Sequence, residues 1–185
     1  MKKDFGKQTF LFPMPVLIIG TYNEDGSANA MNAAWGGIYN DKQICICLDK
    51  SHKTVANVKE KKAFTVSVAD AENITACDYV GIESGNNVKN KIEKAGFKVS
   101  NSRFVDAPVF DNLKMVLECE MVSYDDKTEQ LIGNIINVSA EESVLTDGKI
   151  DPSKLKPVTY DPVNHNYVQL GEVVAKAFDI GVKLK

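Results

Sequence analysis

The chain has 185 residues and a formal net charge of −3, and 44% of its residues are hydrophobic and 25% charged. This length fits one domain, residues 1–185, with enough apolar residues to bury a full core. The acidic balance and the single arginine, Arg103, argue against nucleic-acid binding, which needs a basic stripe with stacking aromatic residues.

Targeting and metal-binding signals are absent from the sequence. The early apolar run at 16–19 is too short to span a bilayer, and residues 1–6 lack the apolar core of a signal peptide. We therefore expect a cytoplasmic protein with no membrane segment. Cys45 and Cys47 fall on one face of a strand, but no second cysteine pair follows at a matching spacing. Reduced, buried thiols are expected in place of disulfides or a metal site.

The first elements in chain order are predicted strands. Residues 16–22 form a buried strand, and residues 23–26 supply a hairpin turn into a second strand at 27–38. This second strand is rich in Ala, Asn and Gly, and small residues along a strand indicate that something flat or bulky packs against its backbone. A turn at 40–42 then leads to a third strand at 43–48.

A helix is predicted from about residue 52 to residue 62. The residues at its start are basic, although a helix N-terminus favours acidic groups. Lys50, His52 and Lys53 crowd the first turn, which has no acidic residue after Ser51. A helix N-terminus carries a partial positive charge and unpaired N–H groups, so it favours anions over cations. A phosphate docked there would resolve the mismatch, which points to a phosphorylated cofactor.

The remaining elements are predicted as strands and short helices, followed by a tail. They are an alternating, half-buried strand at 63–69, a helix near 71–80 capped by Asp70, a helix opened by Ser84-Gly85-Asn86 and stopped by Gly96, strands at 114–122 and 130–139, and a proline-bearing tail at 156–169. Antiparallel hairpins dominate, and neither βαβ alternation nor a glycine-rich nucleotide motif occurs. The pattern favours a closed barrel with helical additions.

The order of several segments resembles a known family. Asn32-Ala33-Ala34-Trp35 lies in the small-residue strand, Cys47-Leu48-Asp49 ends the next strand, and residues 50–54 lead into the helix. This arrangement is similar to the flavin reductase-like FMN-binding split barrel, and within it to the flavoredoxin group. The likeness continues through residues 84–91, 131–135 and 167–173. It implies a mainly β (α+β) fold, a split barrel of antiparallel strands with a few short helices.

The resemblance also implies a cofactor site. In such families FMN lies along the second and third strands, with its phosphate at the helix start. Residues expected to border the isoalloxazine ring are Asn32, Ala33, Ala34 and Trp35, and those expected at its pyrimidine end are Cys47, Leu48 and Asp49. The phosphate would be held by Ser51, Lys53 and Thr54, with Ser84, Gly85 and Lys91 as further candidates. A flat ring needs a wall of little bulk, and a dianion needs preorganised donors.

Several of these residues have a structural alternative. Trp35 is either a wall of the ring site or a core aromatic, and Asn32 is either a ligand contact or an edge residue facing water. Cys47 is expected to be a small apolar filler, because no basic partner activates it. His52 is expected to face solvent.

The hydroxyls and the late lysine have simpler roles open to them. Ser51 or Thr54 could cap the helix, and one hydroxyl can serve both as cap and as phosphate donor. Helix capping and solvation account for Ser84, Gly85 and Lys91 almost as well as cofactor binding does.

The function implied is an FMN-dependent oxidoreductase of the flavin reductase or flavoredoxin type, as a homodimer. The flavin would carry the electrons, and no side chain need act as an acid or base. NADH or NADPH is one possible donor. Short reductases of this family use a late histidine near the nicotinamide, and His165 is not an obvious match, so a redox protein is the other donor. Alternatives are a flavin carrier or sensor, or a barrel that holds pyridoxal phosphate or haem.

Overall fold

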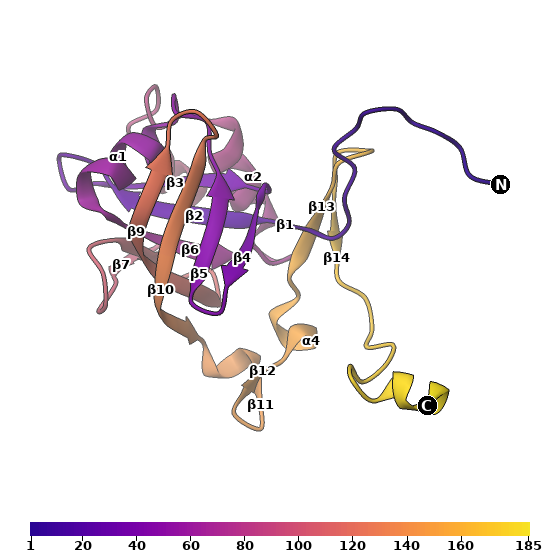
Figure 1. Ribbon diagram of the computed structural model, residues 1–185. Coiled ribbons are helices and arrows are strands. Elements are labelled where there is room, and N and C mark those ends of the chain that lie inside the picture. Colours follow the sequence, from indigo (N-terminus) through magenta and orange to yellow (C-terminus); the bar gives the residue numbers. More distant parts are fainter.

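The computed structural model describes residues 1–185 and contains an antiparallel sheet of seven strands curled into a half-barrel (Figure 1). The strand order is β3-β2-β6-β9-β10-β5-β4. In chain order these strands are β2 (Leu17–Tyr22), β3 (Ala28–Ala33), β4 (Gly36–Asn40), β5 (Gln43–Cys47), β6 (Ala63–Val68), β9 (Met115–Asp125) and β10 (Gln130–Ala140).

The two edges of this sheet are consecutive in the sequence. β3 pairs with β2 and β4 pairs with β5, so the expected single strand at 27–38 was wrong. Only Ala34 and Trp35 join the two edges, and the Trp35 carbonyl accepts a hydrogen bond from the Cys47 amide at 2.8 Å. The chain divides here because its two halves pair with strands on opposite sides of the sheet. No ladder joins β3 to β4, so the expectation of a closed barrel was wrong and that of a split barrel is confirmed.

The sheet packs against two apolar clusters, one on each of its faces. Helix α1 (Lys53–Lys61) contributes Val55 and Val58 to the cluster that also contains Ile19 and Phe64. Helices α2 (Ile74–Ile82) and α3 (Lys91–Ala95) cover a second cluster, which includes Ile18. β2 sends alternate side chains into the two clusters, which explains its continuous apolar run. β6 is likewise buried along its length, so the half-buried pattern expected at 63–69 was wrong.

The helices differ from expectation mainly at their starts. α1 was predicted correctly, with Lys59 and Lys61 in its last turn. α2 begins later than expected, because the Asp70 carboxylate first holds a turn by accepting from the amides of Glu72 and Asn73. The start expected at Ser84 was wrong, since residues 84–90 form turns and α3 begins only at Lys91, whereas the expected stop at Gly96 is confirmed.

The predicted tail at 156–169 is instead a hairpin. Strands β13 (Val158–Asp161) and β14 (Asn166–Gln169) pair with each other, and β13 also pairs with β1 (Met14–Pro15). The Asp161 carboxylate shapes the turn by accepting from the amides of Val163 and Asn164. The hairpin lies at the side of the half-barrel, and the two chain ends extend beyond it (Figure 1).

Short elements complete the chain. They are β7 (Val99–Asn101) paired with β8 (Pro108–Phe110), β11 (Leu145–Thr146) paired with β12 (Lys149–Ile150), α4 (Pro152–Leu155), and 3₁₀ turns at Glu142–Val144 and Ile180–Leu184. None of the helices combines the length and apolar character that crossing a membrane requires.

Candidate functional site

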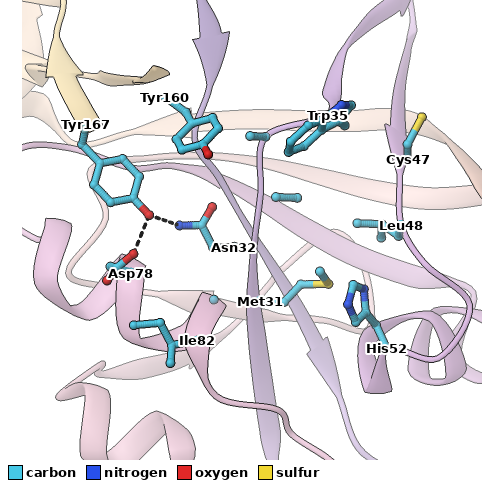
Figure 2. A pocket seen from close by; sticks show the side chains of 13 residues that line it. Met31, Asn32, Trp35, Cys47, Leu48, His52, Asp78, Ile82, Tyr160 and Tyr167 are labelled. Atoms are coloured by element: carbon cyan, nitrogen blue, oxygen red, sulfur yellow. Dashed lines mark hydrogen bonds between the residues drawn. The ribbon is translucent and has the colours of Figure 1, made fainter. Parts of the chain in front are cut away.

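An apolar pocket of about 340 Å³ opens where the two edges of the sheet meet α2 and the late hairpin (Figure 2). Nine of its thirteen lining residues are hydrophobic. It brings together six of the predicted residues, Asn32, Ala33, Ala34, Trp35, Cys47 and Leu48. An apolar concave wall with a few placed polar groups is the usual form of a cofactor site.

The crossover between the sheet edges shapes this pocket. Ala33 and Ala34 leave a wall of little bulk, while Trp35 stands beside them with 50% of its surface exposed. The Trp35 and Tyr160 rings lie 6.3 Å apart, centroid to centroid, and they are tilted against each other. Trp35 is therefore a rim residue and not a core aromatic. Cys47 is exposed and lines the pocket, so the expectation that it fills the core was wrong.

A hydrogen-bonded chain fixes the polar side of the pocket. The Tyr167 hydroxyl donates to Asp78 at 2.6 Å and accepts from Asn32 Nδ2 at 3.3 Å (Figure 2). Asn32 Nδ2 also donates to the Cys77 carbonyl at 3.1 Å, which leaves Asn32 Oδ1 as an acceptor for a ligand. Asn32 is thus held at the pocket and does not face water as an edge residue. Burial, and then the Asp78 carboxylate, raise the pKa of Tyr167.

A second cavity of about 180 Å³ adjoins the first. The two share Met31, His52, Gly81 and Ile82. The second cavity brings together the other group of predicted residues, Lys53, Thr54, Ser84, Gly85 and Lys91. An apolar pocket therefore leads directly into a smaller cavity with hydroxyl and ammonium groups and one carboxylate, that of Glu83.

The cations of this polar cavity, Lys53 and Lys91, form no ion pair, although Glu83 also lines the cavity. The three ion pairs of the structure involve Lys59, Lys114 and Lys156. Lys91 is only 3% exposed, and burial lowers its pKa to about 8, against a smaller opposing effect of Glu83. A buried ammonium that forms no ion pair is costly, and an anionic ligand would reduce that cost.

The start of α1 faces the same cavity. Its N-cap residue, His52, makes no capping hydrogen bond, and its first turn contains no acidic residue. Thr54 is almost fully buried, and its hydroxyl accepts from Asn29 Nδ2 at 3.0 Å, so its own proton is left for a ligand. These groups suit an anion at the helix start.

Two predicted residues stand apart from both cavities. The amide and hydroxyl of Ser51 donate to Asp49 Oδ1 at 2.8 and 2.7 Å, and these bonds lower the pKa of Asp49. Both side chains are exposed, and neither lines the pocket or the polar cavity. Their types and spacing instead produce a local turn before α1.

Other residues of the site were missed by sequence reasoning. Tyr160 and Tyr167 come from the late hairpin, and Asp78 comes from α2. The alternation around Tyr160 and Tyr167, with turn residues between them, was the available signal. His52 is exposed as expected, but it lines both cavities.

Comparison with known proteins identifies the family. A sequence model described as "Flavin reductase like domain" matches residues 9–165. Flavoredoxin of Desulfovibrio vulgaris (Miyazaki F) is 36% identical, with 98% of this chain and 100% of that chain covered and a TM-score of 0.94. Flavoredoxin from Methanosarcina acetivorans is 27% identical, with 100% of both chains covered and a TM-score of 0.90.

A more distant structure shows the same fold. The FMN-binding domain of a flavin reductases-like enzyme from Shewanella baltica OS155 is 19% identical, with 88% of each chain covered and a TM-score of 0.78. The half-barrel and its site thus define a split-barrel protein of the flavin reductase-like class. The chain belongs to the flavin reductase-like family, which makes it a flavin-binding redox protein at the level of the family. The resemblance drawn from the sequence is confirmed.

Proposed function

We propose that the chain binds FMN, with the isoalloxazine ring in the apolar pocket and the phosphate in the polar cavity. One observation carries this proposal: an apolar wall runs directly into a cavity holding Lys53 and the buried Lys91, neither of which forms an ion pair. Both halves suit the corresponding halves of FMN. The bound flavin would supply the electron-transfer chemistry.

The side chains around the ring would bind and orient it. Asn32 Oδ1 offers an acceptor to a ring N–H, and the Asp78–Tyr167 pair keeps that amide in its orientation. Trp35 and Tyr160 would shield part of the ring from water. We assign none of these residues a role as acid or base.

The experiment is a titration with FMN, read by visible absorbance and by quenching of flavin fluorescence. Lys53→Glu places an anion beside the phosphate, and we expect it to weaken FMN binding by at least tenfold. Lys50→Glu is the matched control, because Lys50 lies at the same junction but lines neither cavity. Wild-type protein without flavin affinity, or equal losses in both variants, would contradict the proposal.

The electron donor is either NADH or NADPH or a redox protein. His165 does not line the pocket and contacts it only through Tyr160, whose hydroxyl lies 2.6 Å from His165 Nδ1. Steady-state oxidation of NADH and NADPH by the FMN-loaded protein separates the two donors. Turnover identifies an FMN-dependent oxidoreductase, and its absence with both nucleotides favours a protein donor or a flavin carrier.

We also propose that the protein is a homodimer. The terminal segments extend away from the half-barrel (Figure 1). They carry large exposed apolar side chains, among them Phe5, Phe12, Val174 and Phe178. Exposed apolar surface of this kind marks protein contacts.

A further inference from the structure

Three aromatic rings lie in a row along one side of the apolar pocket. They are Trp35 from the crossover and Tyr160 and Tyr167 from the late hairpin, and all three are at least partly exposed (Figure 2). The ring centroid of Tyr160 lies 6.3 Å from those of both Trp35 and Tyr167, and the neighbouring rings are tilted by 47° and 56°. The rim of the pocket therefore presents several aromatic faces to one ligand.

The hydroxyls of the two tyrosines are engaged by groups of the protein. The Tyr160 hydroxyl lies 2.6 Å from His165 Nδ1, and the Tyr167 hydroxyl donates to Asp78 Oδ1. These bonds hold the rings in place, and they leave the ring faces as the part that a ligand can contact. The face of an aromatic ring carries the negative part of its quadrupole and attracts cations.

A carboxylate without a cationic partner lies beside these rings. Asp78 is half-buried in α2, it forms no ion pair, and its Oδ2 accepts no hydrogen bond. It therefore differs from Asp70, whose carboxylate holds a turn. His52 is the one basic residue that lines the pocket, and it lies away from Asp78 (Figure 2). Ring faces and carboxylate together make this side of the pocket attractive to a positive charge.

We propose that the rim formed by Trp35, Tyr160, Tyr167 and Asp78 binds a small quaternary ammonium compound. The methyl groups of such a cation suit an apolar wall, and its charge is attracted by the ring faces and the carboxylate. A primary ammonium would leave N–H donors unpaired against these rings, and the carboxylate would repel an anion.

The inference goes beyond the binding of flavin. Ala33 and Leu48 form a buried floor of the pocket, whereas Trp35 and Tyr167 are exposed at its rim. A cation at the rim would lie next to a flavin ring on the floor, and this part of the inference rests on the proposed function. In the flavin-free protein the rim would bind the cation alone.

The test is a titration of the flavin-free full chain with choline and with 3,3-dimethylbutan-1-ol, the neutral isostere of choline. Trp35 is the only tryptophan of the chain, so a change in its fluorescence reports binding at the rim. We expect a dissociation constant below about 1 mM for choline and at least tenfold weaker binding of the isostere. Calorimetry with the FMN-loaded protein should give a choline affinity within about threefold of the flavin-free value.

Two substitutions separate the charge and the ring face from simple apolar contact. Asp78→Asn removes the charge but keeps an acceptor for Tyr167, and Tyr160→Leu removes a ring face but keeps apolar bulk. Each should weaken choline binding about three- to tenfold and change the affinity for the isostere less than about threefold. Tyr39→Leu is the matched control, because Tyr39 is an exposed aromatic residue of β4 that does not line the pocket.

The outcomes separate this inference from the proposed function. Equal affinities for choline and its isostere, no binding of choline at about 10 mM, or an unchanged choline affinity in Asp78→Asn would overturn the inference, whatever the affinity for FMN. Displacement of choline by FMN would place the cation in the ring site and also overturn it. Choline binding as expected in a chain that does not bind FMN would contradict only the proposed function.

Discussion

At the scale of single residues, Lys91 is the most informative position. It is 3% exposed, it lines the proposed phosphate cavity, and burial lowers its pKa to about 8. In the flavin-free protein this ammonium is desolvated and forms no ion pair, with only the partial compensation of Glu83 in the same cavity, whereas a bound phosphate would compensate it directly. The charge of Lys91 should therefore lower the free energy of unfolding of the apo protein and raise its affinity for FMN.

Lys91→Met tests this pair of effects, because methionine keeps the length and apolar stem but removes the charge. We expect FMN affinity to fall about 10–100-fold, the loss of one buried charge-assisted hydrogen bond. The free energy of unfolding of the apo variant should exceed that of the wild type at neutral pH. Urea unfolding measures the first effect and FMN titration the second. A variant with both a lower free energy of unfolding and a lower FMN affinity would show that Lys91 is purely structural.

The pH dependence of the same residue has a definite sign. Since its pKa in the folded state lies below the ordinary value of 10.5, the unfolded chain holds the proton more tightly. The Lys91 contribution to the free energy of unfolding therefore rises between about pH 8 and pH 10.5 in the wild type and is missing in Lys91→Met. FMN affinity should fall over the same interval, as the cation that faces the phosphate is lost.

At the scale of elements, the sequence predicted those whose signals are local. The start of α1 at Lys53 could be predicted from its charges and the turn before it, and the strand at 130–139 from its run of β-favouring residues. The division at Ala34 and Trp35 could not, because it depends on which distant strands each half pairs with. The proline-bearing segment 156–169 does not show its hairpin pairing in the sequence, so the wall of the pocket formed by Tyr160 and Tyr167 could not be predicted.

A close approach within the half-barrel supplies a test of its packing. A Cβ atom on Gly133 of β10 would lie 2.4 Å from Cζ of Phe64, a fully buried ring in the core cluster. Gly133→Ala should lower the free energy of unfolding by about 1–3 kcal/mol through overpacking. Gly37→Ala on β4 is the control, because its Cβ would meet nothing within 4 Å. Urea unfolding of both variants measures the difference, and equal free energies of unfolding in the two variants would contradict the packing described.

At the scale of the whole molecule, the terminal segment at 170–185 is the surface through which we expect two chains to associate. The half-barrel holds its cavities without help from residues 170–185, none of which lines the pocket or the polar cavity. Val173, Val174 and Phe178 in this segment are 89%, 98% and 103% exposed, and burying such a side chain contributes about 1.5–3 kcal/mol. In the proposed homodimer, a second copy of the chain would cover them and leave the proposed flavin site intact in each protomer.

The paired change Val174→Asp and Phe178→Asp tests that arrangement, because charges on the segment oppose its burial. We expect light scattering after size-exclusion chromatography to give a dimer for the wild type and a monomer for the variant at micromolar concentration. Lys176→Ala, in the same segment but polar at the outset, should stay dimeric. FMN affinity should change little, since the substituted side chains lie outside the cavities. A monomeric wild type, or a variant that dimerises as tightly, would show that the segment does not join two chains.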